Sequence, residues 1–331
     1  MLETRGIVKR FVKKLDLAGR IAARLGSSDR DVVVHAVDGV DLAIQPGEVV
    51  GLVGESGCGK STLGRVIAGI LPPTQGSVHY GGQDRATMSA REERDARLAV
   101  QMIFQDPFAS LNPRHRVERI IAEAPLFHGL IDKAEARDFT QGIMRQVGLD
   151  PEFMRRYPHQ FSGGQRSRIG IARALAVKPS FLVCDEAIAA LDVSIQAQVL
   201  NLFMDLRADL DLTYLFISHD LGVVQHIADR VVIMYLGRVV EVAPADELFA
   251  SANHPYAQAL LAEVPRLDQR KRVFQPIKGE IPSPIDPPSG CHFHPRCPHA
   301  GPRCARDVPA LKEIAPQRLA ACHLNDGGVT V

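Results

Sequence analysis

The sequence contains no tryptophan, only 5% aromatic residues and no long apolar run. None of its apolar stretches reaches the ~18 consecutive residues that a membrane-spanning helix needs, so any membrane passage is expected to come from other chains. The N-terminal segment lacks the ~7–15-residue apolar centre of a secretory signal, which predicts a cytoplasmic location. An excess of one charge is also missing: 39 Lys and Arg stand against 38 Asp and Glu, which gives no indication of nucleic-acid or anionic-lipid binding.

What the sequence does contain is typical of a globular protein. Hydrophobic residues make up 46% and charged residues 23% of the 331 positions, which excludes a disordered chain. The usual size of domains predicts about two of them at this length, with enough apolar material for a large core. Six cysteines in a cytoplasmic chain are expected to be thiols or metal ligands rather than disulfides.

Residues 1–45 are expected to form an irregular lead-in followed by strands. Val37–Ile44 has apolar residues at alternate positions, as in a half-buried strand, and the apolar run Glu48–Val53 is typical of a fully buried one. A basic stretch in the lead-in is interpreted as a solvated insertion, although a helix lying on a membrane surface is an alternative. Its basic residues are Arg5, Lys9, Arg10, Lys13, Lys14, Arg20 and Arg24.

From residue 54 to about 250, short apolar strands alternate with helical stretches, which predicts an α/β sheet layered by helices. The expected strands are Phe181–Asp185, Tyr214–Ser218, Val231–Tyr235 and Arg238–Val242, the last two forming a hairpin around Leu236-Gly237. Helices are expected at 61–70, 163–177 and 193–210. The Pro-rich run 276–309 breaks this pattern and predicts a separate C-terminal module.

A glycine-rich loop follows the buried strand at Glu48–Val53. It reads GESGCGKST, which fits the pattern G-x-x-x-x-G-K-[ST] between a strand and a helix. Glycines allow successive backbone N–H groups to curl around a phosphate, Lys60 can reach the β- and γ-phosphates, and the Ser61 hydroxyl can bind Mg²⁺. The loop therefore predicts a nucleotide site. Its residues are Gly54, Glu55, Ser56, Gly57, Cys58, Gly59, Lys60, Ser61 and Thr62.

A second motif narrows the class of nucleotide-binding protein. Phe161–Gln165 reads FSGGQ, and twenty residues after Gln165 the strand FLVC ends in Asp185-Glu186. This order resembles the ATP-binding cassette (ABC) ATPases, whose signature LSGGQ precedes the Walker B strand by that distance. The resemblance implies a P-loop NTPase fold of the α/β class with a mainly parallel sheet, an antiparallel β part and a helical subdomain, here about 105–160. The matching signature residues are Ser162, Gly163, Gly164 and Gln165.

Further matches imply catalytic roles. Asp185, with Ser61 and Gln105, would hold the magnesium ion, and Glu186 would polarise the attacking water. Gln105, in FQDP, matches the glutamine of the family's Q-loop, which senses magnesium and water and links to the membrane subunit. His219, in FISHD, matches the switch histidine that contacts the γ-phosphate.

Taken singly, such residues have plainer explanations. A lone His after a strand is commonly structural, a lone Gln commonly lies in a solvated loop, and an Asp-Glu pair commonly caps a helix. It is their order and spacing together that resemble the family. Phe11 falls where the family has an aromatic residue that stacks on adenine, which implies the same role here.

The sequence is similar over nearly its whole length to the dipeptide and oligopeptide import branch of the ABC family. The motifs that carry this similarity are GESGCGKSTLGR, MIFQDPFASLNPR, RYPHQFSGGQR, ALDVSIQAQVLNL, NHPYAQALL and GEIPSPIDPPSGCHFHPRCP. The resemblance implies an ATP-binding domain over 1–255 and a Cys- and Pro-rich module over 256–331. It also implies a peripheral subunit on the cytoplasmic face of the inner membrane that hydrolyses ATP to energise uptake of dipeptides or oligopeptides.

The resemblance implies partners as well. The branch pairs two ATPase subunits with two membrane permeases and an external solute-binding protein, and the second ATPase can be a copy or a non-identical relative. No nucleic-acid partner is expected. Nickel, opines and sugars are alternative solutes within the branch. A soluble ABC ATPase outside transport is a further alternative, but it would typically carry two cassettes or a long coiled-coil insertion, and this sequence has neither.

One stretch departs from the family pattern. Where relatives read DEPVSALD or DEPTSALD, residues 185–192 read DEAIAALD, with Ala187 in place of Pro and Ala189 in place of Ser. Glu186 and Asp192 are retained, so hydrolysis is still expected. Contacts across the ATPase dimer are expected to be weaker, which favours a non-identical partner with the usual sequence.

Four cysteines fall near the C-terminus, separated by 5, 6 and 17 residues. They are Cys291, Cys297, Cys304 and Cys322. Buried free thiols are the general expectation for cytoplasmic cysteines, but this Pro-rich segment has little apolar material to bury them. A structural zinc site is an alternative, with nearby histidines as ligands, although the short Cys-x₂₋₄-Cys spacing is absent. Four cysteines suit a [4Fe–4S] cluster, which members of the branch carry, and this is the favoured interpretation.

Overall fold

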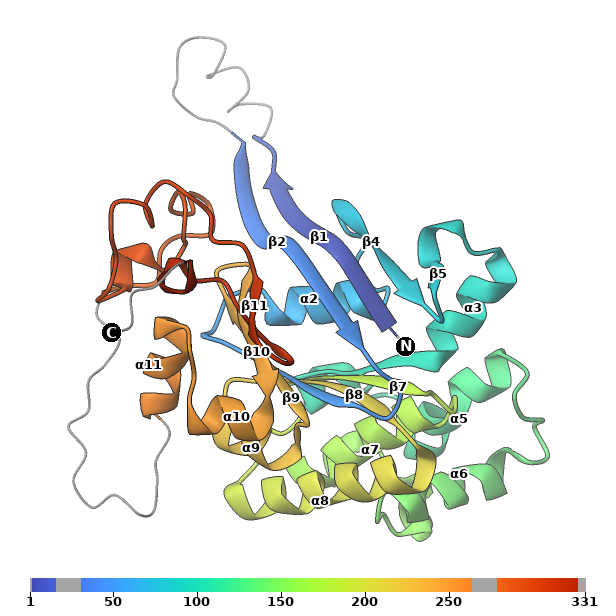
Figure 1. The fold of residues 1–331 in the computed structure, drawn as a ribbon. Coiled ribbons are helices and arrows are strands. Elements are labelled where there is room, and N and C mark those ends of the chain that lie inside the picture. The colour runs from blue at the N-terminus through green and yellow to red at the C-terminus, as the bar shows by residue number, and fades with distance from the viewer. Residues whose placement is uncertain (1, 16–30, 264–278, 327–331) are drawn as a thin grey trace.

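The computed structural model describes residues 2–15, 31–263 and 279–326, and its two sheets share one body (Figure 1). None of the helices in these ranges has both the length and the apolar character required to cross a membrane. The larger sheet has eight strands in the order β11 (Lys312–Ala315), β12 (Arg318–Ala320), β10 (Arg238–Pro244), β9 (Arg230–Tyr235), β3 (Val49–Val53), β8 (Thr213–Ser218), β7 (Phe181–Asp185) and β6 (Val100–Ile103).

The centre of this sheet is parallel. Strand β3 pairs in parallel with β8 and β9, and β7 pairs in parallel with β8 and β6. The expected strand over Phe181–Asp185 is present with the same bounds, and the β9–β10 hairpin is confirmed. Every residue of β3, β7 and β8 is buried, as expected for strands covered by helices on both faces.

The smaller sheet is antiparallel, with the order β2 (Val32–Ile44), β1 (Leu2–Lys13), β4 (Gln75–Tyr80) and β5 (Gln83–Asp84). The irregular lead-in expected at the N-terminus is therefore wrong. Irregularities in the β1–β2 register between Thr4 and Ile7, between Ile7 and Val8 and between Lys9 and Arg10 interrupt the apolar alternation by which a strand is recognised. The alternative of a membrane-surface helix is wrong for Arg5 to Lys13, whereas Arg20 and Arg24 lie outside the described residues.

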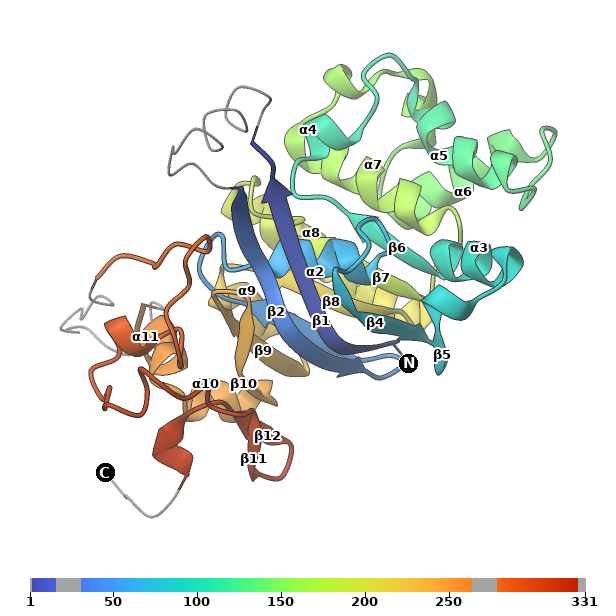
Figure 2. The same ribbon diagram turned by 90° about the horizontal axis from the view of Figure 1, so that it is seen from above.

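Helices cover the larger sheet and build a lobe beside it. The α-helices are α2 (Lys60–Ile67), α3 (Ala90–Ala99), α4 (Pro107–Ser110), α5 (Val117–Phe127), α6 (Ala136–Gln146), α7 (Gly163–Leu175), α8 (Val193–Leu210), α9 (Leu221–Ile227), α10 (Ala245–Ala250) and α11 (Pro255–Glu263). Helices α4–α6 occupy the region predicted to be helical, and Figure 2 shows them on the side of the molecule away from the C-terminal segment. Short 3₁₀ helices are η1 (Arg85–Thr87), η2 (Pro151–Arg155), η3 (Pro158–Gln160), η4 (His294–Arg296) and η5 (His323–Asn325).

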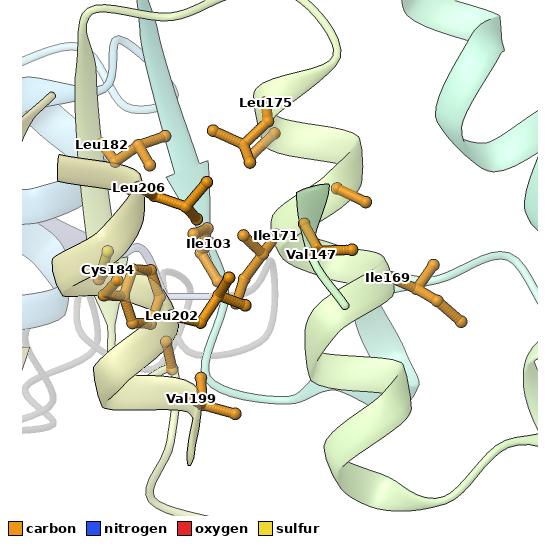
Figure 3. Close-up of a cluster of buried hydrophobic side chains, with 14 of the residues drawn as sticks. Ile103, Val147, Ile169, Ile171, Leu175, Leu182, Cys184, Val199, Leu202 and Leu206 are labelled. Carbon is orange, nitrogen blue, oxygen red and sulfur yellow. The ribbon is translucent and has the colours of Figure 1, made fainter. Parts of the chain in front are cut away.

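A large hydrophobic core joins this lobe to the sheet (Figure 3). Side chains from α7 and α8 meet side chains from β6 and β7. The labelled members are Ile103, Val147, Ile169, Ile171, Leu175, Leu182, Cys184, Val199, Leu202 and Leu206. Burial of each large aliphatic side chain contributes roughly 1.5–3 kcal/mol. This packing holds the N-terminus of α7 and the end of β7 in a stable frame.

The C-terminal segment over 279–326 is mostly loop, in agreement with its Pro-rich composition. It is attached to the rest of the protein at several points. Strand β12 pairs with β10 and so extends the larger sheet, and the His35 N–H donates to the Pro284 carbonyl at 2.9 Å. Arg238 forms an ion pair with Asp38 in β2 and donates to the Gly290 carbonyl at 3.2 Å. The segment therefore packs against β2 and β10.

Candidate nucleotide site

The predicted phosphate-binding, magnesium-binding and catalytic residues lie at one edge of the parallel sheet. The glycine-rich loop follows β3, Asp185 is the last residue of β7, His219 follows β8 and Gln105 follows β6. Because these strands are parallel neighbours, their carboxyl ends meet at the same edge. Ligands of open α/β sheets bind at this edge.

Two glycines of the loop are required by their surroundings. Gly59, which precedes α2, has a φ of 104°, and a Cβ there would lie 2.0 Å from the Ala36 carbonyl oxygen. A Cβ on Gly54, at a φ of 159°, would lie 2.1 Å from the Met234 carbonyl oxygen. The loop is therefore packed directly against β2 and β9, and any side chain at these positions would push it away.

Lys60, the first residue of α2, is held inside the loop. Its Nζ donates to the Gly54 carbonyl at 2.7 Å and to the Glu55 carbonyl at 3.0 Å, and the residue is only 4% exposed. A buried ammonium ion at a helix N-terminus places positive charge inside the loop, which favours an anion there. Cys58 beside it is also buried, and this burial raises the pKa of its thiol.

Ser61 and Asp185 are in direct contact. The Ser61 hydroxyl donates to Asp185 Oδ1 at 2.6 Å. Burial raises the pKa of the Asp185 carboxyl group, and the hydrogen bond from Ser61 opposes that shift. A hydroxyl oxygen and a carboxylate oxygen so close together are ligands of the kind that Mg²⁺ prefers.

Glu186 lies between the other two predicted catalytic residues. Its Oε2 accepts a hydrogen bond from Gln105 Nε2 at 2.6 Å, and its Oε1 lies 3.4 Å from His219 Nδ1. The backbone has a φ of 46°, a left-handed conformation that costs energy for a residue with a Cβ. A hydrogen bond from its N–H to the Ile217 carbonyl, at 3.0 Å, helps to hold it.

The predicted signature segment begins α7. The Ser162 hydroxyl accepts from the Gln165 N–H while the Gln165 side chain accepts from the Ser162 N–H, so the two residues form a capping box. Phe11 lies on β1 with 41% of its surface exposed. Within the part of the chain that the structure describes, no hydrogen bond or ion pair joins Phe11 or this segment to the glycine-rich loop.

Two residues that contact the glycine-rich loop were not identified from the sequence. The Tyr256 hydroxyl, in α11, accepts a hydrogen bond from the Glu55 N–H at 2.8 Å. Arg296, in the C-terminal segment, forms an ion pair with the Glu55 carboxylate at 2.7 Å. The motifs NHPYAQALL and HPRCP contain these residues, but nothing in them indicates a contact with a loop 201 or 241 residues away.

The four C-terminal cysteines line one cavity. Its volume is about 250 Å³, and His254, Phe293, His294, His299 and His323 also line it. All six cysteines of the chain are free thiols. Burial raises the pKa of the Cys291, Cys297 and Cys322 thiols, and the neighbouring thiols raise it further. Across residues 2–15, 31–263 and 279–326, no three His, Cys, Asp or Glu side chains are arranged as a single bound ion would need.

Solved structures with similar folds are ABC cassettes. One is a dimeric post-hydrolysis ATP-binding cassette bound to ADP and phosphate, which is 24% identical with a TM-score of 0.62, and the match covers 74% of this chain and 99% of that one. Another is cbiO1 of Clostridium perfringens, part of an ABC transporter complex, which is 25% identical with a TM-score of 0.61, over 76% of this chain and 90% of that one. They support the predicted cassette fold.

Sequence comparisons place the chain more narrowly. The ABC transporter family model matches residues 37–189, and the model of the oligopeptide/dipeptide transporter C-terminal region matches residues 240–304. The oligopeptide transport ATP-binding protein AppF of Bacillus subtilis is 51% identical over 88% of this chain and 90% of its own length. A probable peptide ABC transporter ATP-binding protein of Sinorhizobium fredii is 50% identical over 88% of this chain and 83% of its own length. The chain therefore belongs to the ABC transporter family, in the branch of oligopeptide transport ATP-binding proteins.

Proposed function

We propose that this protein is the ATP-hydrolysing subunit that energises uptake of dipeptides or oligopeptides through separate permease subunits. The observation that carries the proposal is the site at the sheet edge. There the glycine-rich loop, the Ser61–Asp185 pair and the Gln105–Glu186–His219 group lie at adjacent strand ends. The peptide specificity of the transporter is inferred from relatives named for peptide transport.

The phosphates of ATP would lie in the glycine-rich loop. The backbone N–H groups of residues 54–62 and the N-terminus of α2 provide donors, and Lys60 would exchange its bonds to Gly54 and Glu55 for phosphate oxygens. Phe11 is sufficiently exposed to stack on the adenine ring. This part of the site does little chemistry, and its contribution is to position the γ-phosphate.

Ser61, Asp185 and Gln105 would hold the magnesium ion. The Ser61 and Asp185 oxygens, 2.6 Å apart, fit a hard cation that prefers oxygen ligands. When bound, the ion neutralises charge on the β- and γ-phosphates. An ion there would also stabilise the ionised form of Asp185, whose burial alone raises its pKa.

Glu186 is the residue we assign to the attacking water. Gln105 donates to one of its oxygens, so that oxygen is held and the other remains directed toward His219. A carboxylate in this position can accept a proton from water as it attacks the γ-phosphate. The strained backbone of Glu186 fits a residue whose position matters more than its local stability.

The signature segment would act on a second subunit. Ser162, Gly163 and Gly164 begin α7, whose N-terminal N–H groups can bind the nucleotide of a partner ATPase. Each complete site would then need two chains. Closure around ATP would move the helical lobe of α4–α6 and drive the permeases, and hydrolysis would reopen the pair. An external solute-binding protein and a position at the cytoplasmic face of the membrane complete the proposal.

We further propose that the cysteine cavity holds a [4Fe–4S] cluster. What supports this is that Cys291, Cys297, Cys304 and Cys322 line one cavity, and such a cluster is held by four cysteine thiolates. The four thiolates would hold the irons of the cluster, which is the ligand set that such a cluster requires. ATP hydrolysis involves no electron transfer, so a cluster would have no part in the reaction itself. Its role would be to cross-link the segment or to sense the redox state.

Uptake of labelled solutes in cells that lack this chain tests the transport proposal. A panel of dipeptides and oligopeptides is compared with nickel, an opine and a sugar, and cells are complemented with the wild-type chain or with Lys60→Ala. Peptide uptake should be lost without the chain and restored only by the wild type. Loss of nickel, opine or sugar uptake, with peptide uptake intact, would show that the transported solute is different.

A further inference from the structure

The segment that carries the cavity cysteines also reaches the glycine-rich loop. Arg296 ends η4, directly before Cys297, and its side chain is only 5% exposed. Its Nη1 donates to Glu55 Oε2 at 2.7 Å and its Nη2 donates to Glu55 Oε1 at 2.9 Å. Two parallel hydrogen bonds of this kind are the strongest geometry that an Arg and a carboxylate can form.

Glu55 is the principal partner of this buried cation. Nη1 also donates to the Tyr235 hydroxyl, at a longer distance of 3.4 Å. The Nε–H group is buried and has no hydrogen-bond partner among the described residues. Removal of either charge from such a pair leaves the other one poorly solvated, which costs more than the pair itself contributes.

The main chain of Glu55 is held from the same side. Its N–H donates to the Tyr256 hydroxyl, and the Tyr256 ring packs against Tyr235 and Phe293 with ring centroids 4.6 and 5.3 Å away. Phe293 belongs to the C-terminal segment and lines the cysteine cavity. Both the side chain and the backbone of Glu55 are therefore fixed by residues far beyond the loop in sequence.

The position and charge of Glu55 both bear on nucleotide binding. Its carbonyl oxygen accepts the hydrogen bond from Lys60 Nζ, so Arg296 is connected to the phosphate-binding lysine through one residue. An unpaired carboxylate in a loop that binds a triphosphate would repel the ligand, because neither charge is fully screened there. Arg296 removes that repulsion by neutralising Glu55.

We propose that Arg296 is a positioning residue of the nucleotide site, which neutralises and holds Glu55 so that the C-terminal segment sets the affinity for ATP. The inference rests on the proposed nucleotide site, but not on which solute is transported or which metal fills the cysteine cavity. The segment around the four cysteines is then an integral part of the ATPase, and a change in its packing is transmitted to the glycine-rich loop.

The test measures equilibrium binding of a fluorescent ATP analogue with Mg²⁺ to the full chain. Arg296→Gln should raise the Kd about 10-fold, because Glu55 is left unpaired. Glu55→Gln should weaken binding less than Arg296→Gln does, because no carboxylate is left to repel ATP. The double variant Glu55→Gln/Arg296→Gln should recover most of the loss. In the assembled transporter, Arg296→Gln should raise the KM for ATP and leave kcat near the wild-type value.

Arg318→Gln is the matched control. Arg318 also connects the C-terminal segment to the rest of the protein, because its guanidinium group donates to the Ser251 carbonyl and lies 3.8 Å from the Glu241 carboxylate. It does not contact the glycine-rich loop. The Arg318→Gln variant should therefore leave the Kd for the ATP analogue unchanged. Wild-type affinity in Arg296→Gln, or a double variant as weak as Arg296→Gln, would overturn the proposal.

The remaining variants cover two other outcomes. If Arg296→Gln does not fold, Glu55→Gln and the double variant decide, and a 10-fold loss in both would overturn the proposal. Lys60→Ala tests the nucleotide site separately. If it bound ATP as the wild type does, the assignment of that site would be wrong, independently of Arg296.

Discussion

Gln105 and Glu186 are 81 residues apart in the sequence, yet Gln105 Nε2 donates to Glu186 Oε2 at 2.6 Å. One residue follows β6 and the other follows β7, so the contact depends on the parallel pairing of these two strands. Gln105 leads into the helical lobe of α4–α6. Movement of that lobe would therefore move the glutamine that holds the proposed catalytic carboxylate.

Replacement of Glu186 by Gln should separate hydrolysis from binding. The amide cannot accept a proton from water, so kcat should fall at least about 100-fold while ATP binding is retained and a closed dimer accumulates. Lys60→Ala should instead weaken ATP binding by about 2–3 kcal/mol, because charged hydrogen bonds to phosphate are lost. Steady-state phosphate release and equilibrium binding measure the two effects. Exposed Glu123→Gln, on α5, is the control, and near wild-type turnover by Glu186→Gln would remove Glu186 from its assigned role.

The composition of the native transporter should reveal a second, non-identical ATPase. Ala187 is buried and its carbonyl accepts from the Ser167 hydroxyl, whereas Ala189 is exposed, without the hydroxyl that relatives of the family place there. A partner with the usual Pro and Ser would compensate for that loss at one of the two sites. Mass spectrometry of the complex purified from its own membranes measures this. A complex with two copies of this chain and no other ATPase would show that Ala187 and Ala189 do not require a non-identical partner.

Protein purified without oxygen should contain about four iron and four sulfide ions per chain, as a [4Fe–4S] cluster requires. Cys297→Ser should lose them, since a hydroxyl is a much poorer iron ligand than a thiolate. Cys184→Ala, which removes a buried thiol from β7 outside the cavity, should keep them. Metal analysis and visible absorption give the result. Colourless protein with one zinc ion per chain would show that the cavity holds a structural zinc site instead of the cluster.

The stability of the protein should fall as pH is lowered from 7 to 5, and His254 should account for part of that fall. Its Nδ1 accepts from the Tyr256 N–H at 3.0 Å, and burial lowers its pKa from 6.5 to about 4. In this pH range the unfolded state binds a proton that the folded state does not, so the free energy of unfolding decreases. The contribution of this one group is about 2 kcal/mol over the interval.

Urea unfolding at the two pH values measures the effect. His254→Asn, whose amide oxygen can still accept from the Tyr256 N–H, should flatten the pH dependence by about that amount. His226→Gln, an exposed replacement on α9, should not change it. Equal slopes in the wild type and in His254→Asn would show that another group causes the pH dependence.

Local patterns were sufficient for several parts of the fold. Strand Phe181–Asp185 has the expected bounds because a strand buried on both faces is a continuous apolar run. Helix Val193–Leu210 has the expected bounds because a helix buried along one face has apolar residues at helical spacing. Strand β1 left no such pattern. Its pairing with β2 is irregular at three places, and it is the pairing with β2 and β4 that makes Leu2–Lys13 a strand.

The sequence by itself determined the phosphate-binding chemistry of the proposed nucleotide site, because a loop such as GESGCGKST acts through residues that are adjacent in the chain. Only the tertiary structure decided what surrounds that loop. Arg296 and Glu55 are 241 residues apart, and neither residue carries a local signal for the other. Their ion pair exists because β12 pairs with β10 and the C-terminal segment packs against β2, which brings η4 to the end of β3. Such contacts are specified by the packing of whole elements, and this is why they cannot be read from short stretches of sequence.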